Sequence, residues 1–472
     1  MEMLPDEVLL MVLEELGDAR DILACRLVCK RLAALALHPA VWRDFYFGST
    51  DPRCVCPVMR LVPCIDSIDA QLPEKGCRQW AYATTRCAAK SLRLRVDGAG
   101  QAVYAAAIIS RHEALGRLID VDIEIRATVV TDVTVLLGTL ASTINLKKLF
   151  VYLNPEAEGT STTAPILGGL VVTPSLREFD CNLVPLTERF VKSILSQHAA
   201  TLEEVDLGGS ASSLTCTSAA PLLAAVTNLT KLTCCCLPGM EALTACKSLE
   251  VLEITVHAES LNQPAVAGVA KLLRRAEQLR EVSLEYAPAV RSLADFGAEL
   301  VSALASSGRS RVETLRINNY RHDTDYVGDC PLPQLLVSAL PSLSALRCLS
   351  LEIDGAQRDA FLLAIRPDLA PALQRVEVWV FDGCGHAWIH GDTVKAVLSV
   401  NPSLHLILDV LERVCKDDER CQACELDCHA ELRVDRAGRT WSFPSVYSHD
   451  PLDECPEDHI GDSSELWIHL PF

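Results

Sequence analysis

The chain has 472 residues, 49 % of them hydrophobic and 22 % charged, a balance that excludes a largely disordered protein. This length exceeds what one ordinary compact core uses, and aromatic residues make up only 5 %, so we expect stacked aliphatic layers. The 62 acidic residues outnumber 43 basic ones, which argues against nucleic acid or an anionic membrane as the main partner and leaves a basic protein partner open.

The amino-terminal segment has no pattern of a secretory signal, because it lacks a basic start and carries acids within its apolar stretch. No run of 18 or more apolar residues occurs, so the sequence predicts no membrane-spanning helix. The 21 cysteines are odd in number, and many lie at positions typical of an aliphatic core. We therefore expect reduced thiols in a cytoplasmic or nuclear protein, in preference to a disulfide framework.

Three short amphipathic helices are predicted within the first fifty residues. The first has Leu9, Leu13 and Leu16 at helical spacing, the second begins at Asp21, and the third follows Pro39. So few residues bury too little apolar surface for comfortable independent stability. We expect this unit to pack against a partner or against the rest of the chain.

The order of these residues, from a Leu-Pro pair to a Trp, resembles an F-box over residues 3–47. The resemblance implies docking onto a Skp adaptor and, through it, onto cullin and RING subunits of a ubiquitin ligase, with this chain selecting the protein substrate. Family positions that build or contact the adaptor interface correspond to Leu4, Pro5, Leu9, Leu13, Leu16, Cys29 and Trp42. The alternative for each apolar residue is packing among the three helices.

A short pattern, apolar-x-x-apolar-x-apolar, recurs from residues 118–123 to residues 373–378. Ten copies are readable, spaced about 28 residues apart on average, and a degenerate copy is predicted near Leu404. Each copy predicts one parallel strand, and the intervening segments, such as 266–276, have helical apolar spacing. Stacking such units closes a core that no single repeat buries.

This region resembles leucine-rich repeats of the longer type, with parallel strands on the concave side and helices on the convex side. The predicted fold class is therefore α/β, a three-helix F-box followed by a curved leucine-rich repeat solenoid. The expected domains are the F-box at 1–48, a linker with a helix at 49–90, the solenoid at 91–412, and an acidic, Cys-rich cap or tail at 413–472. The alternative is an ordinary α/β sheet with alternating helices.

The strand residues between the apolar positions are predicted to face the concave side, because side chains alternate along a strand. Acids outnumber bases among them, which suits a basic protein segment with an aromatic or aliphatic anchor and disfavours a phosphorylated one. The predicted substrate-binding residues are Phe150, Tyr152, Glu178, Asp180, Glu204, Asp206, Glu281, Glu285 and Trp379. The alternative is that these strands need only a solvated outer face.

The densest cysteine cluster lies near the carboxyl end of the sequence. Cys421 and Cys424 have the spacing of a zinc knuckle, and Cys428 or His429 with one distal ligand would complete a tetrahedral site. The second pair lacks a clean spacing, so the sequence favours thiols that cap the last repeat. No metal and no cofactor is predicted.

No catalytic motif is present: the sequence lacks a phosphate-binding glycine loop, a Gly-x-Ser-x-Gly elbow and a His-Glu-x-x-His helix. Residues 409–472 carry 16 acids and 6 bases, and we expect this acidic stretch to cap the solenoid. The chain is therefore predicted to be non-catalytic, and the resemblance to F-box proteins with leucine-rich repeats implies a substrate-recognition subunit of a ubiquitin ligase. The alternative is a leucine-rich repeat scaffold or inhibitor that binds protein without ubiquitin transfer.

Overall fold

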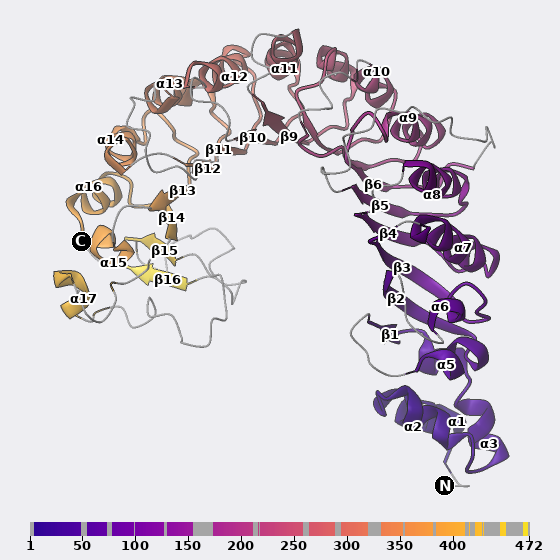
Figure 1. Cartoon of the computed structure of the whole chain (residues 1–472). Helices are drawn as coiled ribbons and strands as arrows, with labels where there is room; N and C mark the ends of the chain where they lie inside the picture. The colour runs from indigo at the N-terminus through magenta and orange to yellow at the C-terminus, as the bar shows by residue number, and fades with distance from the viewer. Residues whose placement is uncertain are drawn as a thin grey trace. The chain divides into compact units, whose positions relative to one another are not determined.

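The computed structural model divides into two compact units, Met1–Thr230 and Lys231–Phe472, and each is described by itself. In both units, each strand lies beside the next strand in the sequence, and helices occupy most of the connections (Figure 1). The structure describes residues 4–48, 54–72, 78–98, 100–126, 130–153, 173–210, 216, 218–257, 264–287, 294–319, 332–352, 355–380, 384–410, 415, 421–426, 428, 444–449 and 466–470.

Four short helices begin the first unit: α1 (Asp6–Glu15), α2 (Ala19–Cys25), α3 (Lys30–Leu35) and α4 (Pro39–Trp42). The prediction of three helices is wrong by one, because a turn after Cys25 divides the second predicted helix. Cys29 has an extended backbone there, and its Sγ accepts a hydrogen bond from the Leu32 N–H, which begins α3. The four helices pack around Leu9, Leu13, Ile22 and Trp42, all of them buried.

The sheet of the first unit is entirely parallel. Its strands are β1 (Tyr46–Phe47), β2 (Cys64–Leu72), β3 (Ala88–Val96), β4 (Asp120–Ile125), β5 (Lys148–Leu153), β6 (Glu178–Cys181) and β7 (Glu204–Asp206). Its remaining helices are α5 (Cys56–Leu61), α6 (Arg78–Ala81), α7 (Gln101–Ala114), α8 (Val130–Ser142), α9 (Glu188–Gln197) and α10 (Ala219–Ala224). The α7, α8 and α9 helices pack in succession over one face of this sheet (Figure 1).

The second unit repeats the same arrangement. Its strands are β8 (Lys231–Cys235), β9 (Val251–Val256), β10 (Glu281–Tyr286), β11 (Thr314–Asn319), β12 (Cys348–Leu351), β13 (Arg375–Val380), β14 (His405–Val410), β15 (Pro444–Tyr447) and β16 (Leu466–His469). Its helices are the 3₁₀ helices η3 (Met240–Ala245) and η5 (Leu340–Ser342), and α11 (Pro264–Arg275), α12 (Ala294–Ser306), α13 (Leu332–Ala339), α14 (Gly355–Ala364), α15 (Gly385–Ile389), α16 (Asp392–Val400) and α17 (Gln422–Leu426). Among the described strands of this unit, only β14 and β15 pair antiparallel.

The ten predicted copies of the apolar pattern coincide with strands β4 to β13, and the degenerate copy near Leu404 leads into β14. Their apolar positions are buried between the sheet and the helices, as at Val121 and Ile123 on β4. The solenoid-like, leucine-rich-repeat-like α/β fold is thereby confirmed. The repeat extends further than predicted, because β3 carries the same pattern with Ala89 in place of the first leucine.

The segment 49–90, predicted as a linker with a helix, contains α5, β2, α6 and the start of β3. β2 is one of the longer strands and pairs with β3 over its full length. In register, Ile65, Ile68 and Ala70 take the three apolar positions of the later repeats, so a short alanine stands at the last of them and weakens the sequence pattern of this strand.

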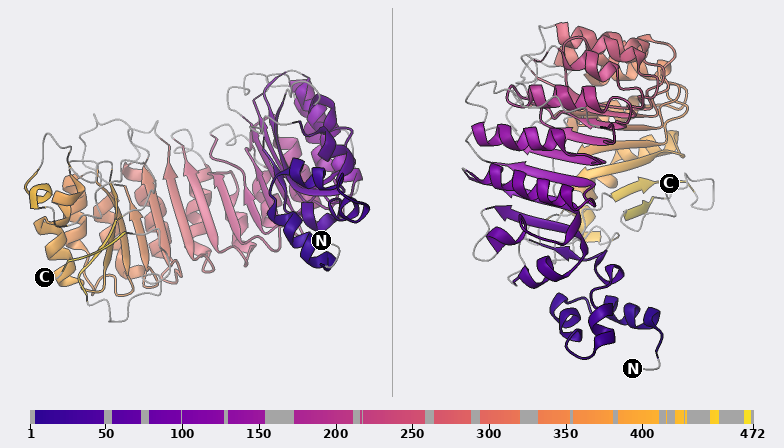
Figure 2. Two further views of the ribbon diagram at one scale, coloured as in Figure 1. Left: turned by 90° about the horizontal axis from the view of Figure 1, so that it is seen from below. Right: turned by 90° about the vertical axis from the view of Figure 1, so that its right-hand side faces the viewer.

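The opposite face of the first unit's sheet is not covered by any helix that the structure describes in that unit (Figure 2). Side chains on this helix-free face are partly exposed and alternate with buried ones, as on β4 and β6. This is the face that the sequence predicts for substrate binding. Among the described helices, none combines the length and the apolar character needed to cross a bilayer.

Candidate functional site

The first candidate surface is the apolar exterior of helices α1 to α3. On α1, Leu9 and Leu13 face the helix core, whereas Met11 and Val12 are 64 % and 52 % exposed. A helix of ten residues therefore presents apolar side chains on two sides, and only one of these sides is used in packing. The exposed apolar side chains of these helices and their connections are Leu4, Val8, Met11, Val12, Leu16, Leu27 and Val28.

Arg31 joins the two ends of this apolar surface. Its Nη2 donates a hydrogen bond of 2.6 Å to the carbonyl oxygen of Leu4, and its Nε donates one of 2.7 Å to Asp6 Oδ1. The start of α3 is therefore held against the start of α1. The turn that carries Leu27, which is 89 % exposed, directly precedes α3. An exposed apolar surface of this kind is a candidate protein interaction site.

The predicted adaptor-binding residues divide into two groups in the structure. Leu4, Pro5, Leu16 and Cys29 are exposed. Leu9, Leu13 and Trp42 are buried, and the Trp42 indole donates a 2.8 Å hydrogen bond to the carbonyl of Ala36, so these three build the helical core. The prediction did not include Val8, Met11 and Leu27 as site residues, although apolar residues on both faces of a ten-residue helix were a readable signal.

The second candidate surface is the helix-free face of the first unit, where the parallel register aligns side chains in rows across the strands. Tyr46, Asp69 and Arg95 are connected on one side of it, because the Tyr46 hydroxyl donates to Asp69 Oδ2 at 3.4 Å and Arg95 lies 3.6 Å from the same oxygen. One continuous row consists of Asp69, Arg93, Asp122, Phe150, Asp180 and Asp206, from β2 to β7.

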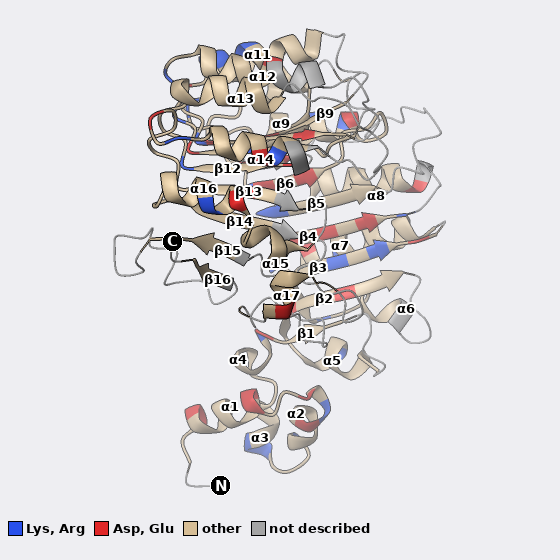
Figure 3. Cartoon of the chain, turned by 90° about the vertical axis from the view of Figure 1, so that its left-hand side faces the viewer, with Lys and Arg blue, Asp and Glu red and all other residues tan. Residues whose placement is uncertain are grey.

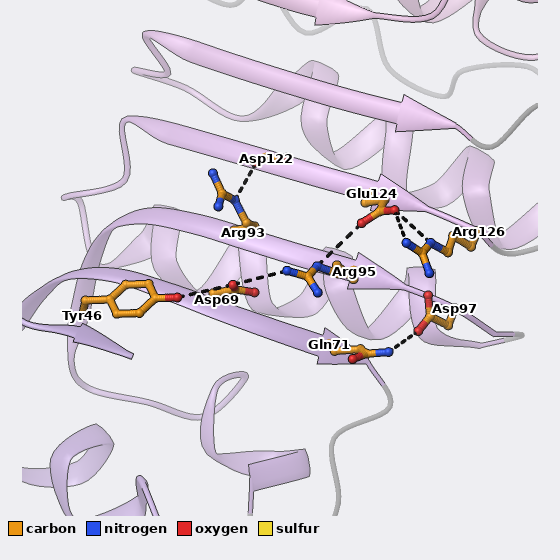
Figure 4. Close-up of polar contacts among 9 residues, drawn as sticks. All are labelled: Tyr46, Asp69, Gln71, Arg93, Arg95, Asp97, Asp122, Glu124 and Arg126. Carbon is orange, nitrogen blue, oxygen red and sulfur yellow. Dashed lines mark hydrogen bonds and ion pairs between the residues drawn. The ribbon is translucent and has the colours of Figure 1, made fainter. Parts of the chain in front are cut away.

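The arginines of β3 neutralise the acids on the strands beside them (Figure 4). Arg93 Nε donates to Asp122 Oδ2 at 2.7 Å, and Arg95 lies 3.6 Å from a carboxylate oxygen of Glu124. Arg126 contacts that same Glu124 side chain at 2.6 Å. The acidic excess predicted from the later repeats is therefore offset at the β3 end of this face.

Basic and acidic strands alternate further along the face, with Lys and Arg on β3 and β5 and acids on β4 and β6 (Figure 3). Lys148 on β5 donates to Glu178 Oε2 on β6 at 2.7 Å. In the second unit, Arg316 pairs with Glu281 in the same cross-strand manner. Two of the predicted substrate-binding acids, Glu178 and Glu281, thus already have partners within the chain.

A hollow of about 490 Å³ opens on this face between β1 and β5. Burial and the neighbouring carboxylate of Asp69 raise the pKa of the Tyr46 hydroxyl at its edge. The residues that line the hollow are Tyr46, Asp66, Ser67, Ile68, Asp69, Lys90, Ser91, Arg93, Ile119, Asp120, Asp122, Lys147, Lys148 and Phe150. The hollow therefore offers both signs of charge and two aromatic side chains, Tyr46 and Phe150.

In the row that runs from Asp69 on β2 to Asp206 on β7, the two residues after Phe150 are both acidic. Asp180 lies between Phe150 on β5 and Asp206 on β7, and burial together with the charges of Asp206 and Asp122 raises the pKa of its carboxyl to about 7. Asp206 Oδ1 accepts a 2.7 Å hydrogen bond from the Gly208 N–H. An aromatic side chain beside two facing carboxylates has the chemistry to bind a cationic side chain with an apolar stem.

The other predicted substrate-binding residues are distributed over both units. Tyr152, 51 % exposed, lies beside Glu124 in the next row, and Glu204 is exposed on β7. Glu285 is on β10 of the second unit, beside Thr255. Trp379 belongs to β13, but its side chain lies outside the described residues.

The predicted metal candidates separate into two clusters in the second unit. Cys421 and Cys424 gather with Cys384 and Cys415, whereas Cys428 gathers with two histidines of another segment. Cys428, which the sequence offers as an alternative to His429 for completing the site, therefore belongs to the other cluster, because it lies beyond the end of α17. His429 lies outside the described residues. Cys384 was missed, since it is 31 residues or more from the cluster in sequence.

The comparison with protein families identifies an F-box-like domain at residues 1–48. The chain therefore carries an F-box-like domain, as the resemblance predicted, followed by a leucine-rich-repeat-like fold. No curated protein sequence matches the chain significantly.

Solved structures with similar chain traces include a yeast complex of Rad7 and Elc1, with 16 % identity, a TM-score of 0.39, and coverage of 79 % of this chain and 88 % of that one. They also include the leucine-rich repeat-containing protein LegL7 from Legionella pneumophila, with 12 % identity, a TM-score of 0.31, and coverage of 84 % of this chain and 100 % of that one.

Proposed function

We propose that the chain is the substrate-recognition subunit of a Skp-cullin-F-box ubiquitin ligase. The observation that carries the proposal is the F-box-like domain at residues 1–48 with its exposed apolar surface on α1 and the α2–α3 turn. That surface is the partner-facing side of a domain whose own core is already complete. The Skp adaptor is its proposed partner, and cullin and RING subunits join through the adaptor.

The repeats are proposed to bind the protein that is ubiquitinated. The first unit offers an extended face with side chains in fixed cross-strand register, and its acidic, aromatic part lies at Phe150, Asp180 and Asp206. We propose a basic protein segment with an apolar anchor as the target. Such a subunit accelerates ubiquitin transfer by raising the local concentration of target lysines near the charged conjugating enzyme, so it needs no catalytic group of its own.

The test is a pull-down from cell extract with the full chain and with a Leu27→Asp/Val28→Asp variant, read by mass spectrometry. Both residues are exposed, so the variant is expected to fold normally and to lose Skp and cullin while retaining targets held by the repeats. A matched control, Val103→Asp, changes an exposed apolar residue on α7 and is expected to retain Skp. Equal capture of the adaptor by all three proteins, or by none, would contradict the ligase assignment and favour a free-standing binding scaffold.

A further inference from the structure

Seven cysteine and histidine side chains gather beside α15 and α17 in the second unit, whereas both surfaces described above belong to the first unit. They form two clusters, and within each cluster all ligand atoms lie within 4.8 Å of one another. The tetracysteine cluster comprises Cys384, Cys415, Cys421 and Cys424, and the His-Cys cluster comprises His386, His390 and Cys428.

We propose that the tetracysteine cluster is a structural zinc site. Zinc in structural sites is bound tetrahedrally by four thiolates at about 2.3 Å, which places the sulfur atoms about 3.8 Å from one another. The Sγ atoms of Cys384 and Cys424 are 3.4 Å apart, and the other sulfur atoms lie within the 4.8 Å limit. Four cysteine side chains that form no disulfide and whose sulfur atoms converge on one point have this geometry in common with a closed zinc site.

Local structure explains how the ligands converge. Cys421 precedes α17 and Cys424 lies within it, so the first helical turn places both sulfurs on one side, and the Glu425 N–H donates to the Cys421 carbonyl at 3.0 Å. Cys384 is the residue before α15. A zinc ion at this point joins two segments about 40 residues apart in the sequence, and such cross-links contribute to folding.

The α17 helix buries little surface of its own, so a bound metal would stabilise it. The helix has five residues and buries only Ala423 and Cys424, while Leu426 is 68 % exposed. A helix of this length is not stable by itself, and two small buried side chains supply little hydrophobic stabilisation. Repeat arrays require a cap after the last repeat. Zinc bound by the tetracysteine cluster would hold this part of the cap in place.

The second cluster supports a second zinc ion on independent evidence. His386 and His390 are four residues apart on α15 and at its end, and their Nε2 atoms lie 3.3 Å and 3.1 Å from Cys428 Sγ. Two ligands bound tetrahedrally to one zinc through nitrogen and sulfur are about 3.6 Å apart. We infer that the His-Cys cluster supplies three ligands to this ion and leaves its fourth position to another group.

The α15 helix, which with its two flanking residues supplies three of the seven ligands, is held against α14. The Trp388 indole donates to Asp359 Oδ1 at 3.1 Å, and the guanidinium of Arg358, itself only 4 % exposed, lies 5.0 Å from the Trp388 ring centre. These contacts fix the orientation of α15 from outside both clusters. Ligands on a supported helix are preorganised, which metal binding requires.

The test measures the zinc content of the full chain, purified under reducing conditions, by elemental mass spectrometry. Two zinc ions per chain are expected. Cys421→Ser/Cys424→Ser should remove one of them and His390→Asn/Cys428→Ser the other, while the control Cys54→Ser, an exposed cysteine of the first unit, should retain both. A single ion that is lost only with the cysteine pair would support the tetracysteine site and overturn the second one.

A second readout on the unmodified chain covers the case in which a variant fails to fold. Alkylation followed by peptide mapping should label Cys421 and Cys424 slowly until a chelator is added, whereas Cys54 should be labelled at the same rate throughout. Equal labelling rates with and without chelator, absence of zinc from the reduced chain, or disulfides linking these cysteines after purification would each overturn the proposal. Zinc that persists in the Cys421→Ser/Cys424→Ser variant at two ions per chain would also overturn the tetracysteine site.

Discussion

Asp180 on β6 and Asp206 on β7 lie directly opposite each other in the parallel register, two carboxylates on the helix-free face of the first unit. Cross-strand neighbours of like charge repel one another. In the folded chain the pKa of Asp180 is raised to about 7, mainly by burial and next by the negative charge of Asp206. The face is therefore acidic at Asp180 and Asp206, whereas the arginines of β3 neutralise the acids at its other end.

Asp180→Asn is expected to stabilise the first unit at pH 8. The pKa of this carboxyl is about 7 in the folded chain and about 3.9 when unfolded, so its stabilising contribution is full below pH 4 and is lost as the pH rises to 7. The variant avoids that loss, so its free energy of unfolding at pH 8 should exceed that of the wild type by about 1–2 kcal/mol after allowance for solvent screening.

Hydrogen exchange of the β6 and β7 amides at pH 5 and pH 8 measures this difference. The wild-type chain should open more readily at pH 8, once intrinsic exchange rates are corrected, and Asp180→Asn should show a smaller change. Glu204→Gln, an exposed carboxyl on β7, serves as the matched control and should behave as the wild type does. An unchanged pH response in Asp180→Asn would show that this carboxyl titrates normally.

Charge reversal at the acidic pair should weaken the binding of a basic target. Asp180→Lys/Asp206→Lys replaces two facing carboxylates with two cations, and we expect at least a tenfold loss of affinity for a Lys- and Arg-rich peptide that the wild type binds. Titration of the labelled peptide, followed by fluorescence anisotropy at two salt concentrations, measures the affinity of each protein.

Glu281→Lys is the comparison for this effect, because Glu281 is already paired with Arg316 in the second unit. We expect less than a threefold change in peptide affinity for that variant. If both variants lost the same affinity, long-range charge and not the Asp180–Asp206 pair would explain peptide binding.

The apolar repeat, strand by strand, was predictable from the sequence because buried positions recur at fixed offsets whatever the charges between them. Strands β2 and β3 escaped detection, since alanine fills one apolar position of the repeat in each of them, Ala70 in β2 and Ala89 in β3. The charge state of the face was predicted less well. Its acids are visible in sequence, but their partners Arg93 and Arg95 are on a strand that was not recognised.

The F-box-like domain and the cysteine clusters show the same limit at the level of single residues. The ordered pattern from Leu4 to Trp42 predicted the domain, yet it did not distinguish Trp42, which is buried, from Leu27, which is exposed. Only the tertiary structure brings Cys384 close to Cys421, so no local spacing in the sequence indicates the complete ligand set.

Core and surface residues of the F-box-like domain should differ sharply in their effect on stability. Trp42→Ala removes a fully buried indole and leaves the Ala36 carbonyl without its donor, which should cost about 3–5 kcal/mol. Met11→Ala changes a side chain that is 64 % exposed and should cost no more than about 0.5 kcal/mol. Hydrogen exchange over α1 to α4 checks both values, and a large loss in Met11→Ala would mean that the exposed apolar surface is part of the fold.

His112 on α7 should make the first unit sensitive to acid. The side chain is buried, its Nδ1 accepts a 3.2 Å hydrogen bond from the Ala89 N–H, and burial lowers its pKa to about 4, with the charge of Arg111 acting in the same direction. The unfolded pKa is about 6.5, so the contribution to stability is complete above pH 6.5 and is lost as the pH falls to 4, by about 3 kcal/mol.

His112→Asn supplies an amide oxygen in place of Nδ1 and does not titrate, so it should reduce this acid sensitivity while keeping an acceptor near Ala89. The wild type and the variant are compared at pH 5 and pH 7 by urea unfolding of the full chain and, separately, by hydrogen exchange of the β3 amides. The wild type should lose more protection than the variant when the pH is lowered. Equal losses would mean that protonation of other groups governs the acid response and that His112 acts only through packing.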